Sequence, residues 1–363
     1  MMLDSKAIYF AGGCFWGVEH FFKGVDGVVK ATPGYANGNL DHRPSYEEVY
    51  TDKTGFAETV EVQYDPARVS LPELVDLYFT VIDPLSVNRQ GGDVGTRYRT
   101  GVYYVSEEDR PLVADRFEEE AFRLGAPLAV ELEPLRCFYP AEEYHQEYLD
   151  KNPGGYCHIP LATFRYLRLY QDLRALLGDE PDPVARMAEA SVLIRERMRW
   201  HWVGFYRVAP KGGVAGCLPE VSGAAGGAAL AAEDCELVLG PFAGPVACLR
   251  IGYGKGVCGT AWKERRTVLV PDVDRFPGHI ACSSLSRSEI VIPVFSHSSS
   301  QVAPSAQPIP SGQLAPSSQP SLSFQGLSLE SPAVTAVLDI DSADPDAFGP
   351  TDALWLGKIA ALI

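Results

Sequence analysis

The sequence predicts an α+β protein of two domains, and three observations lead to this prediction. Strand and helix patterns are mixed over residues 1–170 in an order typical of an α+β fold. A turn-rich stretch, GDEPDP at 178–183, follows this mixed region. After one further helical pattern, the rest of the chain is rich in strand patterns. We therefore expect a first domain at residues 1–172, a linker at 173–185 and a second domain at 186–363.

The elements of the first domain are predicted from hydrophobic periodicity and from helix start signals. The expected strands are Lys6–Ala11, Thr59–Tyr64, Thr100–Val105 and Ala129–Glu133, and the expected helices are 15–25, Leu71–Ile82, Glu107–Leu124 and Ala141–Lys151. The helix at 71–82 is preceded by Ser70 and has Glu73 three residues later, which is the pattern of a capping box.

The second domain is predicted to contain one opening helix and then mainly strands. The helix is expected at Val184–Arg199 and the strands at Trp202–Val208, Glu236–Leu239, Thr267–Val270, Glu289–Phe295 and Thr335–Ile340. A Gly/Ala-rich segment at 211–232 and a Ser/Pro/Gln-rich segment at 296–332 are expected to be disordered insertions. The strands on either side of the second insertion should still pair, because the entropy of closing a loop grows only logarithmically with its length.

Length, charge and cysteine content restrict the class of protein. The chain has 363 residues and a formal net charge of −16, which disfavours nucleic acid and anionic membranes as partners. No apolar run is long enough to span a membrane, and no signal peptide is recognisable at the start. Eight cysteines without a CxxC pair indicate reduced thiols rather than a disulfide framework. We therefore expect a cytoplasmic protein.

The segment GGCFWGVEHF at 12–21 places Cys14 where a strand is followed by a helix. Unpaired N–H groups and the helix dipole at such a terminus favour an anion, and they lower the pKa of a thiol. Cys14 is then a reactive thiol. The alternative is that Cys14 is a small buried apolar residue, which is the commoner situation of a free cysteine.

Five motifs in the first half, GGCFWGVEHF, GYANG, PSYEEVYTDKTGFAETVEVQYD, QGGDVGTRYRTGVYY and FYPAEEYHQEY, closely resemble the peptide methionine-S-sulfoxide reductases of the MsrA family. The resemblance covers nearly all of residues 6–165, and it implies an α/β sandwich. It also implies that a thiolate attacks the sulfoxide sulfur while an acid protonates the departing oxygen, which leaves a cysteine sulfenic acid.

The resemblance assigns roles to individual residues of the first half. Cys14 matches the nucleophile and Glu58 the general acid, whose pKa we expect burial to raise. The substrate-binding residues that the resemblance implies are two aromatics that pack around the substrate methyl, two hydroxyls for the sulfoxide oxygen and a carboxylate that orients those hydroxyls: Phe15, Trp16, Tyr46, Tyr98 and Asp93. The chain departs from the family pattern at GFAE, where relatives often have GHAE, so that Phe56 changes the surroundings of the acid.

Cys157, in NPGGYCHI, matches the resolving cysteine of the family, and Cys137 is expected to be structural. Relatives often carry a further cysteine near the C-terminus of this domain, but the segment 164–177 has none. The resemblance therefore implies that a Cys14–Cys157 disulfide is reduced directly by a thioredoxin-like dithiol. It implies no bound cofactor and no metal.

The second half contains Cys248, Cys258 and Cys282, and motifs alone leave their role open. The segment 254–259 has the GxGxxG spacing of a dinucleotide site, but no repeated βαβ pattern accompanies it. The three cysteines with His279 could instead be a zinc set, although paired CxxC or HxxxH spacing is missing.

Six segments of the second half, WVGFYRV, LVLGPFAGPVAC, GKGVCGTAW, DVDRFPGHIACSS, SEIVIPV and TAVLDIDS, resemble the free methionine-R-sulfoxide reductases, which are GAF-domain enzymes with an antiparallel sheet flanked by helices. The resemblance implies that Cys282 is the nucleophile, that Cys248 is the resolving thiol and that Cys258 is a third cysteine of the site, which assists or replaces Cys248. It implies that the substrate is held by three carboxylates and two pocket aromatics, Glu289, Asp339, Asp341, Trp202 and Tyr206.

Asp339 and Asp341 alternate on an otherwise apolar strand, so both should face one side of the sheet. Two acids on such a face are costly unless they bind a cation, and the α-ammonium group of a free amino acid is one such cation. The sequence thus predicts a bifunctional, thiol-dependent methionine sulfoxide reductase that acts on oxidised proteins and on free methionine sulfoxide. The alternative is a sulfoxide reductase whose GAF-like half senses a ligand and has no catalytic role.

Overall fold

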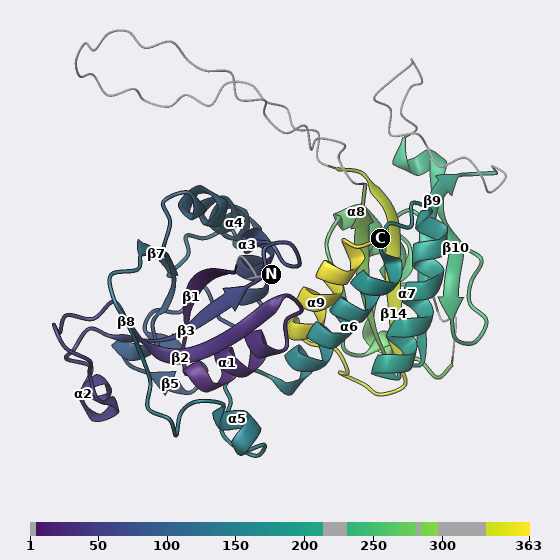
Figure 1. The fold of residues 1–363 in the computed structure, drawn as a ribbon. Helices are drawn as coiled ribbons and strands as arrows, with labels where there is room; N and C mark the ends of the chain where they lie inside the picture. Colours follow the sequence, from purple (N-terminus) through teal and green to yellow (C-terminus); the bar gives the residue numbers. More distant parts are fainter. Residues whose placement is uncertain (1–4, 213–230, 281–283, 297–331) are drawn as a thin grey trace, which may run out of the picture. The chain divides into compact units, whose positions relative to one another are not determined.

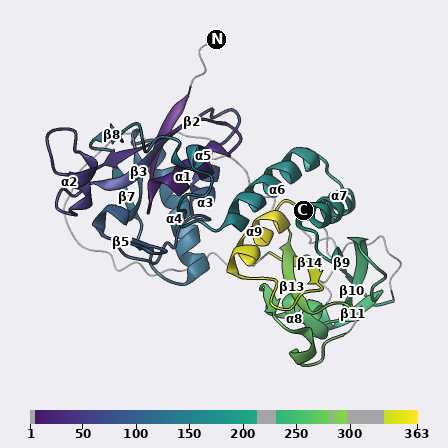
Figure 2. The ribbon, with the colours of Figure 1, turned by 90° about the horizontal axis from the view of Figure 1, so that it is seen from below.

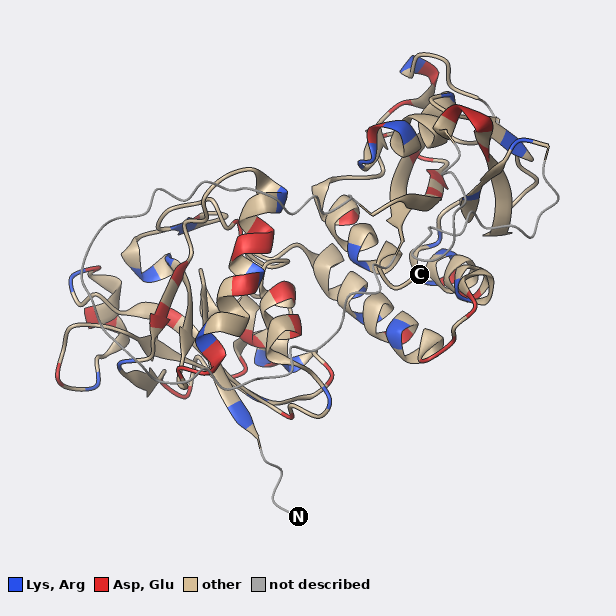
Figure 3. Cartoon of the chain, turned by 90° about the horizontal axis from the view of Figure 1, so that it is seen from above, with Lys and Arg blue, Asp and Glu red and all other residues tan. Residues whose placement is uncertain are grey.

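The computed structural model describes residues 5–212, 231–280, 284–296 and 332–363, and these divide into two compact units. The first unit comprises residues up to Asp179 together with Pro350–Ile359. The second comprises Glu180–Gly349 together with Ala360–Ile363. Both units are α+β, as predicted (Figure 1). Lys and Arg are interspersed with Asp and Glu along the helices of both units (Figure 3). In the described ranges, no helix combines the length and the apolarity needed to cross a membrane.

The first unit is built on a six-stranded sheet that is antiparallel except for its pair β6–β7. In spatial order its strands are β7 (Glu131–Pro134), β6 (Thr100–Tyr104), β1 (Lys6–Gly12), β3 (Ala57–Tyr64), β2 (Val28–Ala36) and β8 (Phe138–Pro140). A separate pair consists of β4 (Arg89–Gln90) and β5 (Asp93–Val94). The central strand β1 is buried over Ile8–Gly12, in keeping with its mostly apolar sequence, whereas β3 is mostly buried although it carries polar residues such as Glu58 and Thr59.

Helices α1 (Phe15–Lys23) and α4 (Asp109–Leu124) of the first unit pack on this sheet, α1 on β2 and β3 and α4 on β6 and β7 (Figures 1 and 2). The other helical elements of the unit are α2 (Tyr46–Tyr50), α3 (Leu71–Tyr78), the 3₁₀ turn η1 (Thr96–Tyr98), α5 (Tyr148–Lys151), α6 (Leu161–Leu177) and, from the C-terminal segment, α9 (Pro350–Ala360). Helix α9 packs on α6, where the rings of Tyr166 and Trp355 stack and the Tyr166 hydroxyl donates to Asp352 at 2.6 Å.

The prediction of a helix at Ala141–Lys151 is wrong over most of that range. Only α5 is helical, because Glu147 has a left-handed backbone with φ of 54°. The N–H of Glu147 donates to the carboxylate of Glu19 on α1 instead of to a carbonyl one turn earlier. The helix expected at 71–82 ends earlier, at Tyr78, and Ser70 caps its first turn by accepting from the N–H of Glu73. Strand β2 and helix α2 were not predicted.

The second unit has one six-stranded sheet that is antiparallel throughout. In spatial order its strands are β11 (Arg250–Gly252), β10 (Cys235–Ala243), β9 (Trp202–Pro210), β14 (Val334–Ser342), β13 (Ser288–Phe295) and β12 (Val268–Val270). The predicted pairing of β13 with β14 across the second insertion is confirmed, with Glu289 opposite Asp341 and Val291 opposite Asp339. Most of the two predicted insertions, residues 213–230 and 297–331, lie outside the described residues.

Two helices cover opposite faces of the second sheet, α7 (Pro183–Met198) and α8 (Gly256–Glu264) (Figure 2). Helix α7 packs on β9 and β10, and Asp182 caps it by accepting from the N–H of Val184. Helix α8 packs on β13 and β14 and contributes Val257, Cys258 and Trp262 to the core of that face. The short turns η2 (Ala232–Asp234) and η3 (Val273–Arg275) complete the unit.

Candidate functional sites

Cys14 lies at the junction between β1 and α1, where the sequence predicted it. It occupies the N-cap position of α1, and its side chain is 6% exposed. Gly13 before it has φ of 82°, a left-handed conformation that glycine adopts without strain. An added Cβ at Gly13 would also lie 2.6 Å from the Cβ of Gln90. The glycine therefore allows the sharp turn that brings Cys14 to the helix terminus.

Glu58 lies on the central strand β3 and meets the beginning of α1. Its carboxyl group, in a residue 2% exposed, accepts a hydrogen bond from the backbone N–H of Phe15 at 3.0 Å. Burial raises the pKa of Glu58 to about 8, although the Phe15 N–H and the charge of Arg97 act to lower it. The expected rise in pKa is confirmed. The carboxyl group thus carries a proton near neutral pH and can donate it.

The expectation that the helix terminus lowers the pKa of Cys14 is wrong for the substrate-free molecule. Burial raises the pKa of the Cys14 thiol well above its ordinary value, and the neighbouring Glu58 raises it further. The N–H groups at the start of α1 favour the thiolate, but desolvation in the interior opposes it more strongly. The structure therefore contains a neutral thiol beside a neutral acid.

Aromatic rings surround this pair. Phe15 is buried and lies 5.9 Å from the ring of Tyr35 and 5.1 Å from that of His145. The indole N–H of Trp16 donates to Nδ1 of His145 at 3.2 Å, and the indole ring stacks on Tyr148 at 3.8 Å. Phe15 and Trp16 therefore share one aromatic cluster. The sequence analysis did not identify His145 and Tyr148, although both lie in or next to the motif FYPAEEYHQEY.

Tyr46 and Tyr98 reach the same region from different elements. Tyr46 begins α2, whose capping box joins Ser45 and Glu48, and its ring lies 4.7 Å from that of His145. Burial raises the pKa of Tyr46 to about 12 and also raises that of Tyr98, and the charge of Glu58 adds to both effects. The two phenols are therefore protonated near neutral pH, so each can act as a hydrogen-bond donor.

Asp93 and Cys157 both lie near enough to Cys14 to raise the pKa of its thiol. Asp93 accepts a hydrogen bond from the Tyr156 hydroxyl at 3.0 Å and lies 3.9 Å from Nδ1 of His158. The role expected for Asp93 was to orient the hydroxyls of Tyr46 and Tyr98, but the hydroxyl that it binds among the described residues is that of Tyr156.

The thiol of Cys157 packs against the first turn of α1. An added Cβ at Gly17 would lie 2.9 Å from the Sγ atom of Cys157, so a side chain at Gly17 would displace this thiol. Gly17 is three residues after Cys14, and both cysteines are free thiols. Burial raises the pKa of Cys157 as well. Cys137 lies apart, after β7, where its carbonyl accepts from the N–H of Asn37.

The second unit collects three carboxylates on one face of its sheet. Asp339 and Asp341 alternate along β14, and the register places Glu289 of β13 directly opposite Asp341. The prediction that Asp339 and Asp341 face one side is confirmed, because both line the same pocket with Glu289. The rest of the pocket lining is formed by Ile251, Gly256, Val257, Cys258, His279, Ile280 and Ser286.

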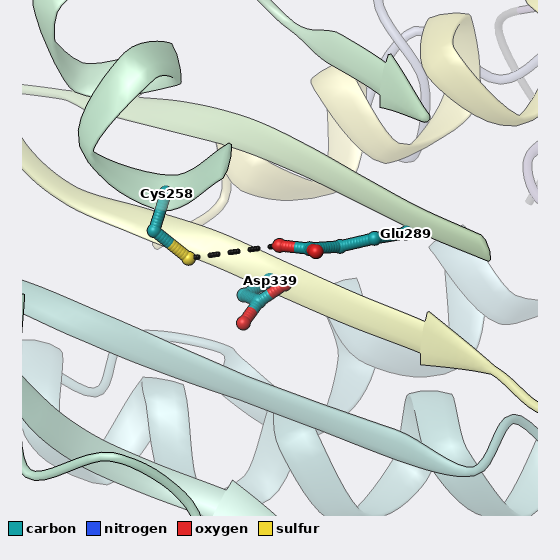
Figure 4. A group of neighbouring side chains, drawn as sticks. All are labelled: Cys258, Glu289 and Asp339. Carbon is teal, nitrogen blue, oxygen red and sulfur yellow. Dashed lines mark hydrogen bonds between the residues drawn. The ribbon is translucent and has the colours of Figure 1, made fainter. Parts of the chain in front are cut away.

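Cys258, Glu289 and Asp339 all line this pocket, and their side chains point toward one another (Figure 4). Their ligand atoms lie within 4.8 Å of one another, and all three residues are buried. The thiol of Cys258 is 4.0 Å from Oε1 of Glu289. Within the described part of the chain, Oδ1 of Asp339 has no hydrogen-bond partner. Thiol and carboxylate donors at this spacing could hold a metal ion, but this set differs from the zinc set considered from the sequence.

Burial controls the ionisation of this cluster. Burial raises the pKa of Glu289 and of Asp339. The charges of neighbouring carboxylates raise both pKa values further. Burial raises the pKa of Asp341 to about 6. Burial also raises the pKa of the Cys258 thiol, and the negative charges of Asp339 and Glu289 raise it further. His279, not assigned from the sequence, lies 3.6 Å from Oε2 of Glu289. A cation in the pocket would stabilise the ionised carboxylates.

Trp202 and Tyr206 lie on the same face as the carboxylates. The register places Trp202 opposite Asp341 and Tyr206 opposite Val337, and residues opposite each other in an antiparallel pair share a face. Both aromatics also hold the segment before β11, since Trp202 donates to the carbonyl of Pro245 at 3.0 Å and Tyr206 to that of Cys248 at 3.1 Å. The proposed nucleophile Cys282 lies outside the described residues.

Known proteins resemble the chain in both halves. The family model for peptide methionine sulfoxide reductase matches residues 6–174. Peptide methionine sulfoxide reductase MsrA of Clostridium acetobutylicum is 54% identical over 155 residues, which is 43% of this chain and 95% of that protein. The MsrA protein of Lachnoclostridium phytofermentans is 52% identical over 160 residues, which is 44% of this chain and 96% of that protein.

Solved structures resemble each half of the chain as well. Methionine sulfoxide reductase A of Corynebacterium diphtheriae is 35% identical, covers 43% of this chain and 83% of its own, and has a TM-score of 0.39. The free methionine-R-sulfoxide reductase of Neisseria meningitidis, in complex with its substrate, is 35% identical, covers 54% of this chain and 84% of its own, and has a TM-score of 0.38.

Proposed function

The chain belongs to the peptide methionine sulfoxide reductase family, MsrA, and is a methionine sulfoxide reductase; we propose that its first unit reduces methionine-S-sulfoxide, both protein-bound and free, with Cys14 as nucleophile and Glu58 as general acid. The observation that carries this proposal is the buried carboxyl group of Glu58. It is held at the start of α1 beside Cys14, and its pKa of about 8 keeps it protonated.

In the proposed first step, Sγ of Cys14 attacks the sulfoxide sulfur while Glu58 donates its proton to the sulfoxide oxygen. The S–S bond formed by this attack and the S–O bond of the sulfoxide then break as the protonated oxygen passes to Sγ, and the proton that the thiol gives up restores Glu58. Methionine leaves with its sulfur reduced by two electrons, and Cys14 becomes a sulfenic acid. The neutral thiol and neutral acid of the substrate-free site supply the protons that this step uses.

The phenols of Tyr46 and Tyr98 are proposed to donate hydrogen bonds to the sulfoxide oxygen, and Asp93 to keep the surrounding hydroxyls oriented. Phe15 and Trp16 are proposed to pack against the substrate methyl group, since aromatic rings make favourable contacts with sulfur-bearing side chains. Support comes from the buried aromatic cluster around Cys14 and from the protonated state of both phenols.

Cys157 is proposed to resolve the sulfenic acid. Its thiolate attacks Sγ of Cys14, an S–S bond forms, and the hydroxyl group leaves as water after taking up a proton. The position of the Cys157 thiol against Gly17, on the first turn of α1, supports this assignment. A thioredoxin-like dithiol is the proposed external reductant, and the cytoplasm, which keeps thiols reduced, is the proposed location.

The test of this function is a four-substrate assay of the full chain. The substrates are the S and R diastereomers of methionine sulfoxide, each as the free amino acid and within a blocked peptide. The first site is expected to reduce both S substrates with a dithiol reductant. Failure to reduce the S peptide would contradict the proposal.

We further propose that the second unit reduces free methionine-R-sulfoxide. The observation that favours this activity is the pocket in which three carboxylates gather on an otherwise apolar sheet face. An α-ammonium group brings one positive charge and three N–H donors, so it would pair with the carboxyl groups of Glu289, Asp339 and Asp341 and would give Oδ1 of Asp339 a partner. A peptide-bound methionine has no such group, so the pocket chemistry favours the free amino acid.

In this second site, Cys282 is the proposed nucleophile, Cys248 the proposed resolving thiol and Cys258 a third thiol of the site. Trp202 and Tyr206 are the proposed pocket aromatics. Cys258 points at the carboxylates, where burial and negative neighbours keep its thiol protonated, so it is better suited to donate a hydrogen bond than to attack sulfur.

The alternative function of the second unit is ligand sensing by a GAF-like domain without catalysis. The same four-substrate assay separates the two. Reduction of the free R form, in wild type and in a variant with an inactivated first site, supports catalysis. Binding of the free R form without turnover would support sensing.

A further inference from the structure

We propose that Glu19 is a positioning residue for the substrate pocket of the first unit, because it holds residues 145–148 against Trp16. The proposal rests on the proposed function in one respect, namely that Trp16 packs against the substrate. Glu19 lies on α1, three residues after Trp16 and close to one helical turn away, so both side chains face the same segment.

The contact that carries the proposal is a buried, bifurcated hydrogen bond. Glu19 is 1% exposed, and both of its carboxylate oxygens accept from the backbone N–H of Glu147, at 2.9 and 3.0 Å. Burial raises the pKa of Glu19 to about 7, while the Glu147 N–H and Lys23 act to lower it. A buried acid on a helix is costly unless a specific partner compensates it, and here the partner is one main-chain N–H.

This main-chain contact sets the path of the chain. Glu147 has φ of 54°, a left-handed conformation that is unfavourable for a residue with a side chain. In a continuous helix its N–H would bind the carbonyl of residue 143, but here it binds Glu19. The chain therefore turns at Glu147, with His145 before the turn and Tyr148 at the start of α5 after it.

Both residues that flank this turn contact Trp16. His145 accepts the indole hydrogen bond at 3.2 Å, and Tyr148 stacks on the indole ring at 3.8 Å. Glu19 thus acts on Trp16 through two intermediate side chains, and it does not itself belong to the aromatic cluster around Cys14. Loss of the Glu19 contact frees the turn and, with it, both partners of the indole.

The other contacts between α1 and this segment are of a different kind. Lys23 forms ion pairs with Glu147 and Asp150, and His20 pairs with Asp150 at 3.0 Å. These side chains are partly or fully exposed, and ion pairs in solvent contribute little to stability. Glu19 is the buried contact, so it should determine the geometry, whereas Lys23 offers a matched control on the same helix.

The experiment measures steady-state kinetics on a peptide containing methionine-S-sulfoxide for Glu19→Ala, Glu19→Gln and Lys23→Ala, all in the full chain. Glu19→Ala leaves a buried N–H without a partner and should raise KM about tenfold with a smaller change in kcat, the pattern of lost binding. Glu19→Gln keeps one acceptor oxygen and should raise KM by a smaller factor, on the order of threefold. Lys23→Ala should leave KM unchanged. Circular dichroism and Tm establish that each variant is folded, and Glu19→Gln remains informative if Glu19→Ala does not fold.

A double-mutant cycle separates positioning from a general structural role. If Glu19 acts through Trp16, then Glu19→Gln should change KM much less in a Trp16→Phe background than in wild type. Equal effects of Glu19→Gln in both backgrounds, or an unchanged KM in folded Glu19→Ala, would overturn the proposal. The role of Trp16 is tested separately by the single variant. If Trp16 does not contact the substrate, Trp16→Phe alone should leave KM at the wild-type value.

Discussion

The backbone N–H of Phe15 donates a hydrogen bond to Oε2 of Glu58 at 3.0 Å, and this contact joins the start of α1 to the central strand β3. Because Cys14 immediately precedes Phe15, the bond holds the carboxyl group of Glu58 beside the thiol. The pair is buried, and burial raises the pKa of both groups.

Replacement of Cys14 by Ser should abolish reduction of peptide methionine-S-sulfoxide, because a serine hydroxyl is a much weaker nucleophile than a thiol and cannot take up the sulfoxide oxygen as a sulfenic acid. Reduction of free methionine-R-sulfoxide should persist, since the proposed second site does not use Cys14. Product release from both substrates, measured by chromatography with a dithiol reductant, checks the prediction. Residual S-peptide activity would mean that another thiol carries out the first reaction.

Replacement of Glu58 by Gln keeps the shape of the side chain but removes its transferable proton. The rate of sulfoxide reduction at the first site should therefore fall about 10²–10⁴-fold, the usual contribution of a general acid. Single-turnover kinetics measure this rate without the reductant step. Glu61→Gln is a matched control on the same strand, where the carboxylate of Glu61 accepts from the Tyr9 hydroxyl outside the site. Similar losses in both variants would argue against an acid role for Glu58.

The raised pKa of Glu58 also predicts how stability depends on pH. Its ordinary pKa is 4.5 and its pKa in the folded chain is about 8, so between these values the folded state binds more protons and stability falls as pH rises. Relative to Glu58→Gln, the wild type should lose on the order of 4 kcal/mol between pH 4.5 and pH 8. Tm measured for both proteins across this pH range tests whether Glu58 makes stability fall as pH rises. The other buried acids are present in both proteins, so their effects cancel in the difference. A constant difference in Tm would contradict a buried, neutral Glu58.

The thiols of the second unit can be separated by single-turnover analysis with free methionine-R-sulfoxide. Cys282→Ser should give no methionine, because the nucleophile is absent. Cys248→Ser should release about one methionine per enzyme and then stop at a sulfenic acid, unless Cys258 replaces it. A full burst from Cys282→Ser would show that the nucleophile is misassigned. Stoichiometric zinc bound by Cys248, Cys258 and Cys282 would contradict a redox role for this half.

Replacement of Asp339 by Asn should raise the KM for free methionine-R-sulfoxide about 10- to 100-fold, because a buried ammonium group loses a charged partner. Reduction of the S peptide at the first site should be unaffected. Glu236→Gln on β10 is the control, since Glu236 pairs with Arg250 away from the pocket. An N-acetylated R-sulfoxide should be a poor substrate for the wild type. Equal reduction of the free and the acetylated forms would exclude an ammonium site.

The features that the sequence by itself determined are those with a local pattern. The place of Cys14 between a strand and a helix follows from hydrophobic periodicity within a few residues of it, and the structure agrees. The common face of Asp339 and Asp341 follows from the two-residue period of a strand, and the pairing of β13 with β14 was expected because closing the long insertion between them costs little entropy. Five motifs in a fixed order along the chain indicate the MsrA family, and both the motifs and their order can be read from the sequence.

The tertiary structure alone decided the features that depend on burial and on contacts between distant residues. Local pattern predicted a lowered pKa for Cys14, but Glu58, which is 44 residues away, and the surrounding interior raise it. The helix expected across Glu147 is absent because a carboxylate on α1, distant in sequence, accepts its N–H. Cys258 meets Glu289 and Asp339 only after three separate elements are packed together. Periodicity and capping report on neighbours along the chain, whereas desolvation and long-range hydrogen bonds arise when segments far apart in sequence exclude water together.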